Sequence, residues 1–109
     1  MLSDAPLLLV LCADATAASP DLDAFRQNIE QQMAEQGVAA SAATLLLAAH
    51  AAGLAGCWLS APLFAPEETR KSLRLPQSWQ PQALLILGYP LHNPEKPVRR
   101  PLSEVTLWR

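Results

Sequence analysis

The sequence predicts an α+β fold, in which a mixed β-sheet of about three strands packs with helices around one buried helix rich in Ala and Leu. The main observation is the stretch 38–60, because no Asp, Glu, Lys or Arg occurs between Glu35 and Glu67. Ala and Leu form helices readily, and a helix that is apolar on every face must be covered on every face. Two short apolar runs, at residues 6–12 and 83–88, predict buried strands beside it.

The stretch 38–60 is long enough to cross a bilayer, so lipid is an alternative to protein as its cover. Several features favour protein. His50 would lie inside the membrane, the charged flanks are acidic rather than basic, and Gly53, Gly56 and Pro62 interrupt the run. We therefore expect a buried helix in a water-soluble protein, and a membrane-associated peptide is the third alternative for the whole chain.

The chain has 109 residues, half of them hydrophobic, which suffices for one domain with a modest core. So short a chain covers a helix poorly, which predicts a homodimer through the helix Val38–Ala52 or a partner chain that supplies the rest of a larger fold. The net charge of −2 argues against nucleic-acid binding. Cys12 and Cys57 lie in apolar runs and are predicted to be buried free thiols. Free thiols, and the lack of a signal-like N-terminus, favour the cytoplasm.

The first half of the chain is predicted to contain one strand and two helices. The run at residues 6–12 is typical of a central strand buried on both faces. Ser19 before Pro20 is typical of a helix start, and Gly37 is expected to separate this first helix from Val38–Ala52. The first helix has one apolar stripe, at spacings of three and four, made of Leu22, Phe25, Ile29 and Met33. Its wet side is expected to carry Arg26, Gln27, Glu30, Gln31 and Glu35.

After the second helix, the pattern predicts a strand and a third helix. Gly53 stands where a left-handed cap would end the second helix, and residues 57–59 are typical of a short buried strand. Pro66, followed by two glutamates, is expected to open the third helix, because carboxylates favour the positive end of the helix dipole. This helix should end at Leu73 or Arg74.

The last third of the chain is predicted to hold one strand and an extended tail. Residues 76–81 begin and end with proline and are predicted to form a loop. Residues 83–88 form the second strong buried strand. Beyond Tyr89, repeated prolines exclude regular helix and predict an extended segment.

No group of side chains predicts acid–base catalysis or metal binding, so we assign no catalytic residue and no metal site. His50 and His92 have no partners at ligand spacing, and His50 is interpreted as a packed core or interface residue. Trp79 and Trp108 are interpreted as packing residues.

The tail concentrates positive charge at Lys96, Arg99 and Arg100 in an otherwise acidic chain. One interpretation is a solvated basic patch. The other is a phosphate clamp, in which arginine supplies bidentate hydrogen bonds.

A set of motifs in fixed order narrows the function. The chain contains LLLAAHAAG at residues 45–53, CW at 57–58, LRLP at 73–76, WQP at 79–81 and GYP at 88–90. These motifs, with PLLLVLCAD before them and KPVRRPLSEVTLWR after them, resemble the C-terminal half of the nitroreductase family of flavin enzymes. The segment Glu30–Met33 is most similar to the branch found as the C-terminal domain of deazaflavin-cofactor glutamyl ligases.

The resemblance implies a nitroreductase-like fold, a homodimer, and FMN bound at the subunit interface with NAD(P)H as the reductant. By position, the segment along the flavin ring corresponds to Trp58, Leu59, Ser60 and Ala61. The arginine that contacts the flavin phosphate corresponds to Arg99, with Lys96 or Arg100 in support. No acid–base side chain is required, because the flavin carries the hydride chemistry.

Two differences from the family pattern affect the expected function. Ala43-Thr44 stands where the family usually has a Gln-Asn pair, and the family's N-terminal half has no counterpart in the sequence. We therefore expect residues 1–109 to form one partial nitroreductase-like domain. Its expected function is FMN-dependent oxidoreduction of a nitro, quinone or related acceptor, weak or dependent on a partner. The alternative is a non-catalytic binding or assembly module without flavin.

Overall fold

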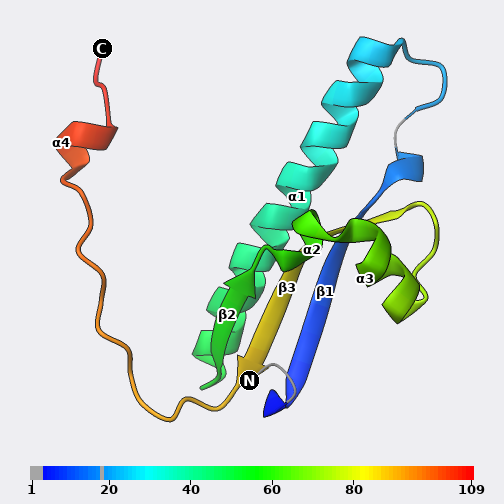
Figure 1. The fold of residues 1–109 in the computed structure, drawn as a ribbon. Coiled ribbons are helices and arrows are strands. Elements are labelled where there is room, and N and C mark those ends of the chain that lie inside the picture. Colours follow the sequence, from blue (N-terminus) through cyan, green and yellow to red (C-terminus); the bar gives the residue numbers. More distant parts are fainter. Residues whose placement is uncertain (1–3, 18) are drawn as a thin grey trace.

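The computed structural model describes residues 4–17 and 19–109, and it has the α+β architecture that the sequence predicts. The elements in chain order are β1 (Leu7–Asp14), the 3-10 helix η2 (Ala15–Ala17), α1 (Ala24–Ala51), β2 (Ala55–Leu59), α2 (Ala61–Phe64), α3 (Pro66–Leu73), β3 (Trp79–Gly88) and α4 (Leu102–Val105). The three strands form one sheet in the order β1–β3–β2 (Figure 1). Every pairing is antiparallel, so the sheet is not mixed.

The central strand is β3, and the prediction that residues 6–12 form the central strand is wrong. β3 pairs with β1 on one side and with β2 on the other, so β1 and β2 are both edge strands. Leu85 of β3 is completely buried, whereas Leu7 and Leu8 of β1 are 46% and 44% exposed. The apolar runs of the two strands look alike in sequence, and only the pairing order decides which of them lies inside.

The two faces of the sheet are covered to different extents. The α1 face includes Ala83, Leu85 and Leu87, all at most 5% exposed. Gly56 lies on the same face, since a Cβ there would overlap the Leu46 side chain of α1. The strand register places the other apolar residues on the opposite face. This face, called the open face below, consists of Leu8, Val10, Cys57, Leu59, Leu84 and Ile86.

Helix α1 is one continuous helix of 28 residues, so the prediction of two helices separated by Gly37 is wrong. A glycine inside a helix costs only about 1 kcal/mol relative to alanine, which the flanking helix formers outweigh. The predicted start at Ser19 is also wrong: the N-cap is Asp23, whose carboxylate accepts a hydrogen bond from the Arg26 N–H at 2.9 Å. The predicted left-handed residue after the helix is confirmed, because Gly53 has φ of 80°.

The predicted faces of the N-terminal half of α1 are reversed. Gln31, expected on the wet side, donates from Nε2 to Gln80 Oε1 of β3 at 2.6 Å. The predicted apolar stripe instead faces outward: Phe25 is 73% exposed, Met33 63%, and Leu47 in the second half 72%. A helical projection at 100° per residue places Met33 and Leu47 opposite the buried Ala42 and Ala49, and Phe25 about 100–120° away from these alanines. We call Phe25, Ile29, Met33 and Leu47 the outward stripe.

A helix covered on every face is therefore not found within one chain. Only two residues of α1, both alanines, are buried, although the helix has an apolar stripe on each side. No helix in the described part of the chain is both long enough and apolar enough to span a membrane. The outward stripe is an exposed apolar surface of the kind that marks an interaction site.

Helix α3 matches its prediction and is fastened to the start of β3. It ends at Leu73, and Arg74 follows in the left-handed region with φ of 52°. Arg70 bonds Glu67 at 2.6 Å and donates from Nε to the Trp79 carbonyl at 3.2 Å.

The predicted loop at residues 76–81 is too long, since β3 already begins at Trp79. Prolines occur in strands beside bulges, and the β1–β3 register shifts next to Pro81.

Residues 89–109 form an arm that leaves the body of the protein (Figure 1). The arm is extended as predicted except for the single turn α4. Its apolar side chains are exposed, and Trp108, predicted to pack, is 88% exposed. The radius of gyration is 17.1 Å. A compact chain of this length would have about 13 Å. The arm, like the outward stripe, lacks a partner surface within its own chain.

Replacing the most buried side chain of β3 should destabilise the fold strongly. Leu85→Ala is expected to lower the free energy of unfolding by about 2–5 kcal/mol, because it leaves a cavity between the sheet and α1. Urea denaturation followed by circular dichroism measures the change. Leu91→Ala removes the same atoms from a side chain that is 99% exposed and should change the free energy by less than about 0.5 kcal/mol. Similar losses for the two variants would contradict the placement of β3.

The stability of the protein should depend on pH through Asp14, at the end of β1. The Thr16 N–H at 3.0 Å, then the Thr16 hydroxyl at 2.8 Å, lower the pKa of the Asp14 carboxyl below its ordinary 3.8. Because the folded-state pKa is the lower one, the stabilisation exists above about pH 4 and disappears as the pH falls through the folded-state value. Asp14→Asn should therefore destabilise the protein at pH 7, and the difference from wild type should be smaller at pH 3. Urea titrations at both pH values test this, with Asp21→Asn as the control.

Candidate functional site

The four residues predicted to lie along a flavin ring form the turn from β2 into α2. Trp58 and Leu59 end the strand, Ser60 occupies the N-cap position, and Ala61 opens the helix. The Ser60 carbonyl accepts the Leu63 N–H at 3.0 Å, while the Ser60 side chain makes no capping hydrogen bond. The Ser60 hydroxyl is therefore not used to cap the helix and is available to bind a ligand.

The outer edge of β2 offers backbone hydrogen-bonding groups. β2 pairs only with β3 in the described part of the chain, so its N–H and C=O groups on the other side have no partner strand. Cys57 is exposed and Trp58 is 38% exposed, so the prediction of a buried strand with a buried Cys57 thiol is wrong. An edge strand with free donors and acceptors suits a flat heterocycle whose own rim carries both.

The three basic residues of the predicted phosphate clamp lie on the arm. Lys96, Arg99 and Arg100 are all exposed, and none of them forms an ion pair with another described residue. Figure 1 shows that the arm runs away from the β2–α2 turn of its own chain. The structure thus keeps Trp58–Ala61 together but does not bring Arg99 to Ser60 within one chain.

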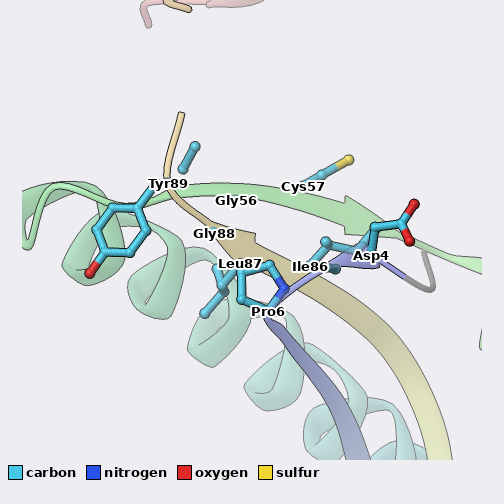
Figure 2. A pocket seen from close by; sticks show the side chains of 10 residues that line it. Asp4, Pro6, Gly56, Cys57, Ile86, Leu87, Gly88 and Tyr89 are labelled. Atoms are coloured by element: carbon cyan, nitrogen blue, oxygen red, sulfur yellow. The ribbon is translucent and has the colours of Figure 1, made fainter. Parts of the chain in front are cut away.

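A hollow of about 390 Å³, which the sequence does not predict, lies where β2 begins and β3 ends. Figure 2 shows Tyr89 on one side of it and Asp4 on the other, with Cys57 pointing away from Leu87. The thiol thus belongs to the open face. Apart from the GYP motif that contains Tyr89, no signal in the sequence marks this hollow. None of the seven predicted cofactor residues lines it.

A larger hollow of about 670 Å³ lies between the strands and helices α2 and α3. Leu8, Val10 and Leu84 of the open face form its floor, and α3 forms one wall. We call it the α3 groove. Of the predicted site residues, only Ala61 lines it. The groove therefore begins beside the β2–α2 turn and continues across the open face.

The described side chains form no centre for acid–base or metal chemistry. No three His, Cys, Asp or Glu residues among them could hold a metal ion, and none of the described polar residues is buried. Burial raises the pKa of the Cys12 thiol, which therefore stays protonated at neutral pH. His50, predicted to be packed, is exposed in the single chain. What the arrangement offers is a backbone edge, a free hydroxyl and basic side chains, which can bind and position a cofactor.

The fold recurs in solved structures of about twice the length. The chain superposes on a Bacteroides fragilis protein assigned as an oxidoreductase, with a TM-score of 0.78 and 25% identity over 95% of this chain and 45% of that one. For NfrA2 of B. megaterium the TM-score is 0.73, with 26% identity over 94% of this chain and 45% of that one. The fold class is therefore nitroreductase-like in its structural neighbours as well as in its own elements.

Sequence comparison leads to the same family. The chain is 34% identical to a Thermus thermophilus protein named NADH dehydrogenase, over an alignment of 132 positions, gaps included, that covers 97% of this chain and 62% of the relative. The chain thus spans less than two thirds of that relative's length. Residues 1–89 match the sequence model of the Nitroreductase family. Because this match covers most of the chain, the protein belongs to the nitroreductase family.

Proposed function

We propose that the chain forms part of an FMN-dependent NAD(P)H oxidoreductase. The observation that carries the proposal is the family match over residues 1–89, which includes the β2–α2 turn with its free strand edge. Nitroreductase family members generally bind flavin, and the Thermus thermophilus relative is named for oxidation of NADH. The proposed acceptor class is nitro, quinone or related compounds. The likeness to deazaflavin-cofactor glutamyl ligases stays a prediction.

The ring of FMN would lie along the β2–α2 turn. The free backbone edge at Trp58 and Leu59 would meet the polar rim of the ring, and the Ser60 hydroxyl and Ala61 would lie at its end. When bound, the flavin supplies the hydride chemistry, so the protein has to position the ring and limit its exposure to water. The lack of buried titratable side chains among the described residues is compatible with that division of roles.

The phosphate of FMN would be held by Arg99, with Lys96 and Arg100 in support. An arginine can donate two parallel hydrogen bonds to a phosphate, which makes it the strongest single candidate. Because the arm leaves its own body, we propose that it serves the site of a second copy. Arg99 lies ten positions after Tyr89, and an extended segment of that length reaches about 33 Å. This length exceeds the roughly 10 Å diameter of one helix, so the arm is long enough to extend past a helix to a second copy.

The second copy would be held through α1. The outward stripe runs along this helix of 28 residues, which is about 42 Å long. Stripes of this kind pack well around a twofold axis, because each helix offers the same apolar surface to the other. The proposed interface includes the predicted Val38–Ala52 segment and extends to Phe25.

A specific observation favours the alternative, a non-catalytic module. Ala43-Thr44 replaces an amide pair of the family. The Thr44 hydroxyl donates to the Ala40 carbonyl at 2.9 Å, so it is not directed to a ligand. If flavin binding was lost, the chain would remain as a binding or assembly unit with the same fold. The flavin titration described below distinguishes the two functions.

A charge in the outward stripe should dissociate the dimer. Leu47→Glu replaces a leucine that is 72% exposed in the single chain and would be buried between two α1 helices in the dimer. The dimer would then bury an unpaired carboxylate, which is unfavourable. Light scattering after size exclusion should show the mass fall from a dimer to the monomer of 11.8 kDa. Asn28→Asp changes an exposed residue of α1 that the same projection places about 60° outside the stripe, and it should leave the dimer intact. A wild-type monomer at high concentration would contradict this interface.

Loss of Arg99 should weaken FMN binding far more than loss of another arginine on the arm. The wild-type protein is expected to carry flavin or to bind added FMN, as shown by quenching of flavin fluorescence. Arg99→Ala should raise the Kd by about ten- to a hundredfold, because a hydrogen bond to a charged group contributes about 1.5–3 kcal/mol. Arg109→Ala removes another exposed arginine, ten positions further on, and should change the Kd less than threefold.

Equal effects of the two substitutions would remove the phosphate role of Arg99. A colourless wild-type protein that binds no FMN as a folded dimer would favour the non-catalytic alternative.

A further inference from the structure

We propose that Arg70 is a positioning residue, which holds the β2–α2 turn in place by attaching α3 to the first residue of β3. The consequence for flavin rests on the proposed function, in which the ring of FMN lies along this turn. The placement of the turn itself can be measured without flavin.

Arg70 is an arginine whose side chain is almost completely withdrawn from water. It is 11% exposed, whereas the side chain of Arg26, which pairs with Asp23 at 3.3 Å, is 70% exposed. Nη1 of Arg70 donates to Glu67 Oε1 at 2.6 Å, and Nε donates to the Trp79 carbonyl at 3.2 Å. Withdrawing a charge from water is costly unless its donors are bonded, so these two bonds fix the position of the guanidinium.

The two bonds of Arg70 have different consequences for the fold. Glu67 precedes Arg70 by three positions on α3, so this ion pair stays within one helix. Trp79 is the first residue of β3, and it lies beyond the loop at residues 74–78. The bond to the Trp79 carbonyl is therefore the one that attaches α3 to the sheet.

The second half of the β2–α2 turn is weakly held by its own residues. The pairing of β2 with β3 ends at Leu59. The Ser60 side chain makes no capping hydrogen bond, and α2 has four residues, of which Pro62 is buried against the rest of the protein. A single helical turn is unstable by itself. The positions of Ser60 and Ala61 thus depend on the surfaces to which α2 is joined.

Helix α2 is joined to α3 through Ala65. The Ala65 carbonyl accepts hydrogen bonds from the Thr69 N–H at 3.0 Å and from the Thr69 hydroxyl at 2.8 Å, so the connecting residue is bonded to α3. Leu63 of α2 and Arg70 of α3 line one hollow of about 280 Å³, against residues 80–82 of β3. Attaching Arg70 to β3 therefore fixes α3, the end of α2 and the turn that precedes α2.

Hydrogen exchange followed by NMR on the complete 109-residue protein, without FMN, tests this placement. The reporter is the Leu63 N–H, which donates to the Ser60 carbonyl at 3.0 Å. Arg70→Met removes the donors and should speed exchange at Leu63 about ten- to a hundredfold, because a bond from a charged group is lost. The Gln27 N–H, which bonds the Asp23 carbonyl in the first turn of α1, should change less than about twofold, because helix ends open locally.

Two substitutions on the same helix are the controls. Lys71→Met removes a positive charge from an exposed neighbour of Arg70, and Glu67→Gln weakens only the pair within α3. Each should change exchange at Leu63 less than about threefold. An unchanged rate at Leu63 in Arg70→Met, or an equal increase in Glu67→Gln, would overturn the positioning role.

A measurement on the wild-type protein covers the case in which Arg70→Met does not fold. The Arg70 Nε–H and the Leu63 N–H should exchange with the same opening equilibrium and the same urea dependence, because one event is expected to release both. A smaller urea dependence at Leu63 would mean that α2 opens without α3, and would overturn the proposal.

FMN binding provides the functional measurement. Because α2 is a single turn, we expect its displaced state to be well populated in Arg70→Met, and a turn that is in place a third of the time binds FMN about threefold more weakly. Lys71→Met should leave the Kd unchanged. An unchanged Kd in Arg70→Met would overturn the role of Arg70 in binding. A wild-type protein that binds no FMN would instead overturn the proposed function, and hydrogen exchange would still decide whether Arg70 places the turn.

Discussion

A sheet whose strands are apolar on both faces has to be packed on both faces, and most features of this protein depend on that requirement. On one face of the sheet, α1 packs closely and covers the strands. Ala42 and Ala49 bring the helix near, and a Cβ on Gly56 would lie 2.8 Å from Leu87 Cδ2. On the other face, α2 and α3 cover the strands only in part. The protein thus combines a well-packed inner layer with an opposite face on which apolar residues stay partly exposed.

Features set by neighbouring residues could be predicted from the sequence. The left-handed Gly53, helix α3 and the buried strand around Leu85 follow from local cap, proline and apolar patterns, and the structure contains all three. The order of the strands could not be predicted, because β1 and β3 are equally apolar and their pairing joins residues more than 60 positions apart. Gly37 alone does not show that α1 is continuous, because strong helix formers on both sides outweigh the cost of one glycine.

The orientation of α1 shows a different limit of sequence patterns. An apolar stripe indicates that something covers it, but it does not say what. Phe25 and Met33 were expected to face the sheet, yet the sheet side is taken by Gln31, which bonds Gln80. The same limit applies to the candidate site. Trp58–Ala61 is contiguous and could be placed on one turn, whereas the position of Arg99 relative to that turn depends on how chains assemble.

The direction of the arm has a consequence for how the cofactor would be handled. If one chain binds the flavin ring and another chain binds its phosphate, no isolated chain has a whole site. The fraction of sites with bound flavin would then depend on how many chains are associated. Dilution would then separate chains and release flavin in one step. Protein purified from dilute extracts would then be colourless and free of flavin, whereas the same protein at its concentration in the cell would have flavin bound.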